Sequence, residues 1–392
     1  MRIVLIITDF GSFNNFLAEL AVDMNKNNHQ VHVISSGKKV INRNDKYDYE
    51  QLGIKLHNVN FPRGFNFYKH YQASVEIHKI IDAIDPDLVH IHFTTGIFTT
   101  VFVKKPKYLT IGTFHGLGYP VLEGMKRKIF KSVEYFCFNR LDQLWVLNKF
   151  DYDIIKAVRP KKAFIYKSLG LGCDLDRFDP TKFDDSIKVK IKEELDIRPD
   201  DFVISYTGRF VDFKGFHLTV RSFLAIHKKH KNIKLILMGG RDSIHPTGLT
   251  PAEESEMNNC EGIINIGFTN EIEKYLAISD VFVFPSIKEG MPVCIIEALA
   301  MNIPVISSDS RGCNDLVTDG FNGYLVSNPP NVKDIEDKIM LLLRNPEKRD
   351  ELSRNASSQR SDYDRENYIK EQFGIYTELI ENLKEKKNFP AI

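Results

Sequence analysis

Short runs of apolar, mostly β-branched residues recur along the chain and alternate with helical patterns. Each run lacks the alternation of polar and apolar residues, which is typical of strands that are buried on both faces of a sheet. The runs are Ile3–Ile7, Val31–Ile34, Leu88–Ile91, Tyr108–Thr113, Leu144–Leu147, Ala163–Tyr166, Phe202–Tyr206, Lys234–Met238, Ile263–Ile266, Val281–Phe284 and Pro304–Ser307. Strands that alternate with helices predict parallel sheets covered by helices on both sides.

Three further segments show the spacing of amphipathic helices, so we expect one face of each to be buried. Their apolar positions are, in chain order, Phe13, Phe16, Leu17, Leu20, Ala21 and Met24; Val332, Ile335, Ile339 and Leu342; and Ile369, Phe373, Tyr376, Ile380 and Leu383.

The eleven predicted strands could close one barrel or form two open sheets. A length of 392 residues suits two or three domains of ordinary size. A glycine-containing stretch at 169–172 favours two sheets joined near residue 172. We therefore predict domains at 1–171 and 172–365, with the polar stretch 179–201 as a connector and a lysine-rich helix.

The composition is that of an ordinary globular protein, with 43% hydrophobic and 27% charged residues. It excludes disordered, collagen-like and coiled-coil chains, and the net charge of +1 gives no sign of a nucleic-acid-binding protein. No apolar run is long enough to span a membrane. The five cysteines are scattered, which fits reduced thiols and a cytoplasmic location.

The charge is unevenly distributed between the two halves. The first 170 residues hold 24 Lys and Arg against 15 Asp and Glu, and the rest hold 29 against 37. This asymmetry is either ordinary solvated surface or an attraction of the first half to an anionic membrane or a phosphate-bearing acceptor.

Doubly wound sheets bind ligands at the carboxyl ends of their strands, so functional residues are expected in the loops there. The loop after the first strand contains one glycine, Gly11, and lacks the G-x-G-x-x-G pattern of dinucleotide sites. Gly11 either lets backbone N–H groups approach a phosphate at the next helix or sits in a tight turn.

The loop at 206–215 carries Gly208, Arg209 and Lys214 between a strand and a helix, without a Walker A sequence. Arg209 can bind phosphate oxygens in bidentate fashion, and Lys214 supplies a mobile positive charge. Such a pair suits a diphosphate leaving group, whose negative charge grows as its bond breaks. The alternative is two solvated loop cations.

The segment 285–300 follows an apolar strand and carries two glutamates. Gly290 permits a sharp turn, and Pro292 suits the first position of a helix. Glu289 then lies in the loop and Glu297 about one and a half turns into an apolar helix. A carboxylate there needs a partner. Two hydroxyls of a sugar would serve, and so would a nearby Lys or Arg.

Taken in order, Gly208-Arg209-x4-Lys214-Gly215 and Glu289-x7-Glu297 resemble the retaining glycosyltransferases of family 4. Supporting stretches lie at 113–116 and 170–178. The stretches 167–170, 239–242 and 288–293 are similar to the branch that builds bacterial lipid-linked, capsular and O-antigen glycans. The resemblance implies the GT-B fold: two Rossmann-like domains face each other across a cleft, and a C-terminal helix, about 366–392, returns to the N-terminal domain.

The resemblance also implies a role for each candidate residue. Arg209 and Lys214 would hold the diphosphate of a nucleotide-sugar. Glu297 would bind the ribose, and Glu289 the transferred sugar. His115 would face that sugar from the acceptor-side N-terminal domain, and Gly11 would line the acceptor side. Further donor-binding positions are Gly208, Gly240, Phe268, Thr269, Gly290, Met291, Pro292 and Val293, with the loop at 267–269 holding a base, expected to be uracil.

Two of these positions have other interpretations. Relatives carry a pair of glycines in the first loop, where this chain has Gly11 alone. A histidine at a strand end, as His115 is, often has a structural role. We interpret the neighbouring His90 and His92 as structural.

No metal ion and no cofactor is expected, since the nucleotide-sugar is a substrate. Three Asp-x-Asp pairs begin at Asp85, Asp151 and Asp174, and we expect them to lie in turns or at helix starts, where Asp caps N-termini. Arg209 and Lys214 supply the positive charge that a metal would otherwise provide. The family mechanism is a same-face displacement in which the departing phosphate takes the proton of the acceptor.

Two basic groups and an aromatic stretch in the first half bear on the acceptor. A basic helix with apolar neighbours indicates a membrane-surface element, although core packing with solvated charge is the alternative. Together with the family branch, these features favour a polyprenyl-diphosphate-linked or glycan acceptor at the inner membrane face. The residues are Lys104, Lys105 and Lys107; Met125, Lys126, Arg127, Lys128, Ile129, Phe130, Lys131 and Val133; and Phe61, Phe65, Phe67, Tyr68 and Tyr71.

Other functions stay open at this point. A transferase making a free disaccharide or a glycolipid headgroup, or a nucleotide-sugar epimerase, could use the same fold. A non-catalytic scaffold that binds nucleotide-sugar is a second class. Arg209, Lys214, Glu289 and Glu297 are all intact, which argues against a decayed enzyme.

Overall fold

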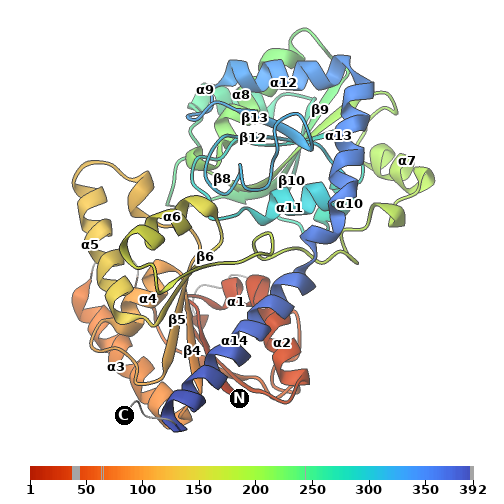
Figure 1. Cartoon of the computed structure of the whole chain (residues 1–392). Coiled ribbons are helices and arrows are strands. Elements are labelled where there is room, and N and C mark those ends of the chain that lie inside the picture. Colours follow the sequence, from red (N-terminus) through yellow and green to blue (C-terminus); the bar gives the residue numbers. More distant parts are fainter. Residues whose placement is uncertain (38–44, 63, 65, 243, 389–392) are drawn as a thin grey trace. The chain divides into compact units, whose positions relative to one another are not determined.

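The computed structural model describes residues 1–37, 45–62, 64, 66–242 and 244–388, and it divides the chain into two compact units (Figure 1). Unit 1 comprises Met1–Lys167 and Tyr368–Ile392, and unit 2 comprises Ser168–Asn367. The chain therefore leaves unit 1 close to the predicted joint and returns to it near the C-terminus.

Unit 1 is built on a parallel sheet of seven strands in the order β3-β2-β1-β4-β5-β6-β7. The strands are β1 (Arg2–Ile6), β2 (Gln30–Ser35), β3 (Lys55–Asn58), β4 (Leu88–His92), β5 (Leu109–Phe114), β6 (Gln143–Val146) and β7 (Ala163–Ile165). Ile3 of β1 pairs with Val31 on one side and with Leu88 on the other. The strand order therefore reverses between β1 and β4.

Unit 2 repeats this plan with six parallel strands in the order β10-β9-β8-β11-β12-β13. They are β8 (Phe202–Phe210), β9 (Ile233–Arg241), β10 (Ile263–Gly267), β11 (Val281–Phe284), β12 (Val305–Ser308) and β13 (Gly323–Val326). Here the order reverses between β8 and β11. Ligands of doubly wound sheets bind at such a reversal, beyond the carboxyl ends of the strands.

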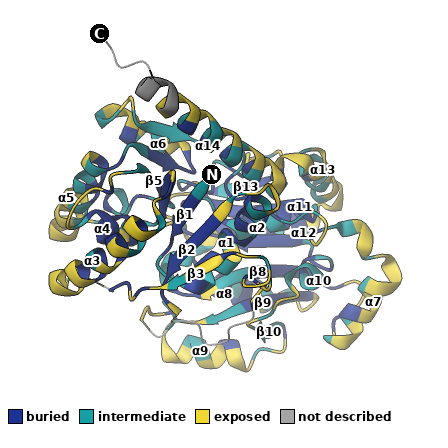
Figure 2. Ribbon diagram, turned by 90° about the horizontal axis from the view of Figure 1, so that it is seen from below, coloured by how far each residue is buried: buried dark blue, intermediate teal, exposed yellow. Residues whose placement is uncertain are grey.

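Helices connect the strands of both sheets. Those of unit 1 are α1 (Phe10–Phe16), α2 (Ala18–Lys26), α3 (Phe67–Ile84), α4 (Thr94–Val101), α5 (Gly124–Arg140) and α6 (Lys149–Val158), with the 3-10 turn η2 (Tyr119–Val121). Those of unit 2 are α7 (Asp185–Glu194), α8 (Phe216–His227), α9 (Pro251–Asn258), α10 (Ile272–Leu276), α11 (Val293–Ala300), α12 (Val332–Arg344) and α13 (Pro346–Ser358), with the turns η3 (Pro180–Lys182), η4 (Asp212–Lys214) and η5 (Arg360–Tyr363). The last helix is α14 (Arg365–Asn388). The strands are largely buried, and the outer faces of helices such as α7 and α9 are exposed (Figure 2).

The predicted architecture is confirmed, with two differences in detail. All eleven predicted runs form strands, and the structure adds β3 and β13, each at the edge of its sheet. The prediction of a single helix over Phe13–Met24 is wrong, because the helix is interrupted at Leu17, which separates α1 from α2. The stripe in α12 is confirmed, with Ile335, Ile339 and Leu342 buried.

From Tyr368 onward, α14 packs on the sheet of unit 1. Its buried positions are Tyr368, Gln372, Tyr376 and Ile380, whereas Leu383 of the predicted stripe is 38% exposed. The Tyr376 ring stacks on Trp145 with 5.8 Å between centroids, and its hydroxyl contacts His90. Tyr166 donates a hydrogen bond of 3.0 Å to Gln372. The buried face is thus rotated toward the polar Gln372, which periodicity of apolar residues does not reveal.

None of the helices in the described ranges combines the length and the hydropathy needed to cross a membrane.

Candidate functional site

The loops that follow β8 and β11 meet at the point where the strand order of unit 2 reverses. Val281 of β11 pairs with Ile204 of β8 in parallel, so both strands end at the same edge of the sheet. Lys214 lies in the loop after β8, and Glu289 lies in the loop after β11. The prediction of Gly208 and Arg209 in the first loop is wrong: they belong to the end of β8 itself, because the strand continues to Phe210 in register with β9. The topology therefore brings together two motifs that lie far apart in the sequence.

Glycines allow β8 and β9 to approach each other closely beside Arg209. Gly208 pairs with Gly239, and Arg209 pairs with Gly240. A Cβ atom on Gly239 would lie 1.9 Å from the carbonyl oxygen of Gly208, so no other residue fits there. A Cβ on Gly240 would meet no atom within 4 Å. Space is therefore open beside Gly240.

Arg209 is held by a carboxylate at the end of β9. Its guanidinium forms an ion pair with Asp242 and lies 5.5 Å from the centroid of the Phe213 ring. Asp242 also accepts a hydrogen bond of 2.8 Å from the Ile244 N–H and lies 3.2 Å from His245 Nδ1. These hydrogen bonds, with that from Ile244 foremost, lower the pKa of Asp242 to about 2. Asp242 is therefore charged at neutral pH and orients Arg209.

Lys214 and Glu289 form a partly buried ion pair, with Nζ 2.5 Å from Oε1. Glu289 is 8% exposed. The Ser286 hydroxyl donates to the same carboxylate oxygen at 2.6 Å, and Arg311 Nε donates to the Glu289 backbone carbonyl at 3.0 Å. A buried charge requires such partners. The family resemblance implied that Lys214 binds the diphosphate and Glu289 the transferred sugar. In the structure the two side chains are in contact.

The turn from Gly290 to Pro292 leads directly into α11. Pro292 is the N-cap, one residue before the helical position predicted for it, and no side chain caps the helix. The first N–H groups of α11, from Val293 onward, thus have no side-chain acceptor at the positive end of the helix dipole. Such a helix start suits an anion.

Tight packing fixes this turn. A Cβ on Gly312 would lie 2.4 Å from the Gly290 carbonyl oxygen, and one on Gly170 would lie 2.8 Å from Met291 Sδ. Both glycines have φ angles in the left-handed region. The turn and its neighbouring loops therefore form a closely packed support for the start of α11.

Glu297 is a partly exposed carboxylate on the otherwise buried helix α11. Burial raises its pKa to about 7, although Arg365 and Arg177 act in the opposite direction. Within the described residues, no hydrogen bond or ion pair engages its carboxylate. The thiol of Cys294 interacts electrostatically with Glu289, Lys214 and Glu297, which places both glutamates around one residue. Glu297 is thus placed to accept hydrogen bonds from hydroxyl groups.

The loop after β10 lies at the same edge of the sheet, two strands away from β8. Gly267 adopts a left-handed φ of 74°, and Phe268 is 85% exposed. The Thr269 hydroxyl accepts a hydrogen bond of 3.0 Å from the Glu271 N–H. An exposed aromatic ring at this place is available for stacking on a planar ligand.

Gly11 and His115 belong to unit 1, whereas the other candidate residues belong to unit 2. Gly11 lies in the first turn of α1, whose N-cap Asp9 accepts a hydrogen bond of 2.9 Å from the Ser12 N–H. The alternative that Gly11 occupies a tight turn is therefore wrong. Its Cβ position would be 3.4 Å from an Asp9 carboxylate oxygen, which is an ordinary van der Waals contact.

His115 follows β5 and is one of three linked imidazoles. Its Nε2 lies 3.1 Å from Nδ1 of His92, and its ring lies 4.3 Å from that of Phe93. Burial lowers the pKa of His115 to about 4, so its ring is neutral at pH 7. His90 contacts Tyr376 and lies 2.6 Å from the Thr113 hydroxyl, which agrees with a structural role. His92 also holds His115 in place.

The residues that the structure describes include no group of three or more His, Cys, Asp or Glu side chains placed to hold a metal ion. The three Asp-x-Asp pairs lie in turns or at a helix start, as expected, but none of their first aspartates is the N-cap of a helix. Asp85 is the C-cap of α3, Asp151 lies within α6, whose N-cap is Asn148, and Asp174 accepts hydrogen bonds from the next turn of backbone.

Three residues that act in this site were not predicted as such: Asp242, Ser286 and Arg311. Asp242 follows the glycine pair 239–240, and Ser286 immediately precedes the turn that carries Glu289, so both lay in stretches already associated with the family. Arg311 comes from the loop after β12, and only the fold brings it to Glu289.

Two doubly wound parallel sheets, the second with cations and carboxylates at its strand reversal, define a glycosyltransferase of the GT-B fold. The model "Glycosyl transferases group 1" matches residues 188–359, and "Glycosyltransferase Family 4" matches residues 14–165. The chain belongs to the family 4 glycosyltransferases, as its motifs indicated.

Characterised proteins of related sequence agree with this assignment. The chain is 27% identical over 293 residues, 72% of each chain, to the UDP-Gal:alpha-D-GlcNAc-diphosphoundecaprenol alpha-1,3-galactosyltransferase of Escherichia coli. It is 26% identical over 359 residues to the N,N'-diacetylbacillosaminyl-diphospho-undecaprenol alpha-1,3-N-acetylgalactosaminyltransferase of Campylobacter jejuni, covering 88% of this chain and 92% of that one. Anabaena Alr3699/HepE, solved in complex with UDP, matches in fold with a TM-score of 0.74, 16% identity and coverage of 98% and 100%.

Proposed function

We propose that this glycosyltransferase transfers a hexosyl or N-acetylhexosaminyl unit from a UDP-sugar to a polyprenyl-diphosphate-linked glycan, with retention of the anomeric configuration. The observation that carries the proposal is the cluster of Lys214, Glu289 and Glu297 beside the uncapped start of α11. Two related enzymes that act on diphospho-undecaprenol-linked sugars, one of them named for a UDP-sugar donor, support the substrate classes.

The cations and the helix start would bind the diphosphate. In the absence of donor, Lys214 neutralises Glu289, and Arg209 is paired with Asp242. A bound diphosphate would give each cation a second anionic partner, and each cation would keep its carboxylate. Because negative charge on the leaving oxygen grows as the bond breaks, these groups stabilise the transition state more than the ground state.

The two glutamates would bind the sugars. Glu289 is fixed by Lys214 and Ser286, so it offers a charged acceptor in a defined position to hydroxyls of the transferred sugar. Glu297 would accept hydrogen bonds from the two ribose hydroxyls, which replace the water lost on burial. Phe268 and Thr269 would contact the base, while His115 would face the transferred sugar as a neutral imidazole.

The proposed reaction is a same-face displacement. The bond between the anomeric carbon and the diphosphate oxygen breaks, and the acceptor oxygen bonds to that carbon on the same face. The departing diphosphate takes the acceptor's proton. We propose that this step needs no metal ion, because Arg209, Lys214 and α11 supply the positive charge; full activity in excess EDTA is the expected result.

The membrane-facing surface of the proposal lies on α5 and the start of α3. Met125 and Ile129 of α5 are 69% and 42% exposed beside the exposed cations Lys126, Arg127 and Lys128. Phe67, Tyr68 and Tyr71 of α3 are also exposed, whereas Phe61 is buried and follows the core alternative, and Phe65 lies outside the described residues. We name the exposed set the α5/α3 surface and propose that it contacts anionic lipid.

A donor screen tests the proposal. Purified protein is mixed with UDP-, GDP- or dTDP-sugars, and the melting temperature shows which one binds. Transfer of the radiolabelled sugar to a bacterial membrane extract then tests catalysis. We expect a UDP-sugar to bind and its label to appear in lipid-soluble product. Binding without transfer or hydrolysis would instead indicate a scaffold, and free UDP with an altered sugar would indicate an epimerase.

A further inference from the structure

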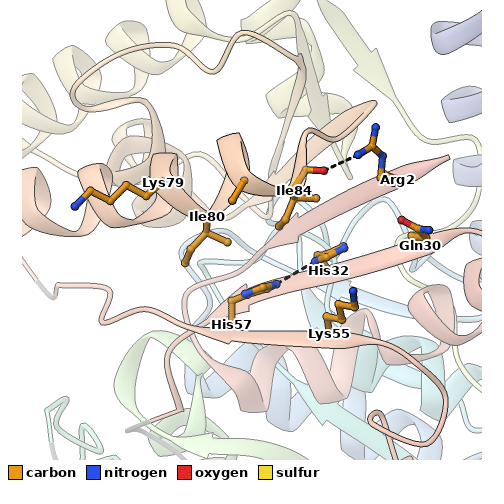
Figure 3. Close-up of a pocket in the computed structure, with 9 residues that line it drawn as sticks. Arg2, Gln30, His32, Lys55, His57, Lys79, Ile80 and Ile84 are labelled. Carbon is orange, nitrogen blue, oxygen red and sulfur yellow. Dashed lines mark hydrogen bonds between the residues drawn. The ribbon is translucent and has the colours of Figure 1, made fainter.

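A pocket of about 460 Å³ lies in unit 1 at the amino ends of β1, β2 and β3, where the second half of α3 covers the sheet (Figure 3). The polar residues that line it are Arg2, Gln30, His32, Lys55, His57 and Lys79, and Ile80, Ala83 and Ile84 of α3 complete the wall. None of the described residues that line the pocket is acidic. It lies at the opposite edge of the sheet from His115, which follows the carboxyl end of β5.

The pocket replaces part of the hydrophobic core on this face of the sheet. Toward the carboxyl ends of the strands, Val4, Ile6 and Ile34 are buried in one cluster with Ile77 and Ile81 of α3. Toward the amino ends, the positions that follow the same alternation are polar: Arg2 pairs in register with Gln30, and His32 with Lys55. Because the end of α3 packs over basic groups, it buries less apolar surface than the rest of the helix. We therefore expect a ligand that neutralises these groups.

A pair of histidines forms the floor of the pocket. His32 is 6% exposed, and its Nδ1 lies 3.0 Å from Nε2 of His57, with the rings stacked at an interplanar angle of 12°. Burial, and then the charges of His57, Lys55 and Arg2, lower the pKa of His32 to about 4. Burial and Lys55 lower the pKa of His57 as well. The pocket is therefore electropositive, and its histidines are neutral at pH 7 without a ligand.

The cations around this pair retain donors for a ligand. Arg2 donates one hydrogen bond of 2.9 Å to the Ile84 carbonyl and lies 3.4 Å from the exposed Asp85, so it is anchored beside the pocket. Among the described residues, Lys55 and Lys79 form no ion pair. Figure 3 shows Arg2, Lys55 and the two imidazoles on one side of the pocket, with the Lys79 amine pointing away at the other end.

We propose that this pocket is a second anion site, which binds a phosphate-type group through Lys55, Arg2 and the His32–His57 pair. A phosphomonoester or diphosphate has the oxygen acceptors that ammonium, guanidinium and imidazole N–H groups recognise. The site is separate from the donor site, since its residues all belong to unit 1 and none belongs to the donor-binding loops. A free phosphate compound and the headgroup of a lipid share this chemistry.

Anion binding is coupled to protonation of the histidines. A bound negative charge favours the imidazolium form, so it raises the lowered pKa values, and affinity increases as the pH falls. The groups beside the pair are Arg2 of β1, Gln30 of β2 and Lys55 of β3, while Lys79 of α3 lines the far end of the pocket. Lys55 also lines an adjacent hollow, whose acidic residues are Asp45, Asp48 and Glu50.

The test is an NMR titration of the full-length protein labelled at its histidines, with inorganic sulfate as a probe that does not titrate between pH 5 and 8. His57→Asn identifies the His57 signal. Sulfate should shift that signal and raise its pKa, with tighter binding at pH 6 than at pH 8. Lys55→Gln should weaken sulfate binding about tenfold. Lys26→Gln, which removes an exposed lysine outside the pocket, should leave it unchanged.

The two sources of the anion are separated by repeating the titration with glycerol 3-phosphate and with vesicles of phosphatidylglycerol. A response to the soluble compound assigns the site to free phosphates, and a response to vesicles alone assigns it to lipid headgroups; either supports the proposal. The proposal would be overturned if none of the three probes moved the His57 signal. It would also be overturned if the probes moved this signal equally in the wild type and in Lys55→Gln, provided that the two proteins have the same melting temperature.

Discussion

Two side chains with defined partners, Arg209 and Lys214, carry the positive charge of the proposed donor site. Asp242 orients Arg209, and Glu289 holds Lys214. Each cation therefore has a fixed position before substrate binds, which is the preorganisation that electrostatic catalysis requires. Sequence spacing predicts both cations as site residues, but their partners lie 33 and 75 residues away and emerge only from the fold.

Replacement of either cation should slow the reaction. We expect Arg209→Ala and Lys214→Ala each to raise the barrier by roughly 2–4 kcal/mol, as loss of an oxyanion donor does. Initial rates of sugar transfer at saturating donor measure this. Arg221→Ala is a control, because Arg221 of α8 pairs with Glu253 of α9 and has no assigned role in the donor site. An unchanged kcat in Arg209→Ala would exclude its assignment.

The raised pKa of Glu297 predicts opposite effects on stability and on donor binding. A carboxyl group whose pKa is about 7 in the folded state and about 4.5 in the unfolded state costs stability as the pH rises through this interval, because the folded state binds the extra proton. Glu297→Gln should therefore raise the melting temperature more at pH 8 than at pH 5, with a stabilisation of roughly 1–3 kcal/mol at pH 8.

The same variant should bind donor less well at pH 8, since a neutral amide is a weaker acceptor for ribose hydroxyls than a carboxylate. The KM for the donor measures this effect. If Glu297→Gln destabilised the protein equally at both pH values, Glu297 would have a structural partner, and the ribose assignment would fail.

At the scale of elements, the close pairing of β8 and β9 supports the site. Gly239→Ala places a Cβ 1.9 Å from a backbone oxygen at a φ of 139°, so the strands must separate. We expect a loss of at least about 2 kcal/mol in stability, measured by thermal and urea unfolding. The adjacent Gly240→Ala is the matched control, because open space surrounds its Cβ and stability should change little. Similar melting temperatures for the two variants would contradict this packing argument.

The elements that sequence patterns predict well are those buried on both faces. Apart from Arg2, the central strands β1 and β11 consist of buried apolar residues, and the alternation of such runs with helices predicts the two doubly wound sheets. The edge strand β3 was missed because Lys55, Leu56 and Asn58 are exposed, so no apolar run marks it. The basic pocket was missed for a related reason: its residues are dispersed over three strands and a helix.

At the scale of the whole molecule, part of the excess positive charge of the first half of the chain lies on α5. The α5/α3 surface combines exposed cations with exposed apolar and aromatic side chains, as interfacial helices do. We expect the combined replacement of Lys126, Arg127 and Lys128 by Gln to reduce binding to phosphatidylglycerol vesicles, with a loss of about 1 kcal/mol per charge.

Vesicle flotation at low and high salt measures this effect. Replacing three lysines of unit 2 by Gln, at Lys188, Lys190 and Lys229, is the matched control and should leave flotation unchanged. Equal flotation of both triple variants, or binding that salt does not weaken, would remove the membrane proposal while leaving the donor site intact.

The return of α14 to unit 1 has a practical consequence for dissecting this enzyme. A fragment that stops at Lys167 would lack α14. Trp145 would then lose its contact with Tyr376, Tyr166 would lose its hydrogen bond to Gln372, and both aromatic rings would be uncovered. Producing unit 1 by itself therefore calls for a rearranged gene, in which the codons for the last helix are joined through a short linker to the codons for residues 1–167.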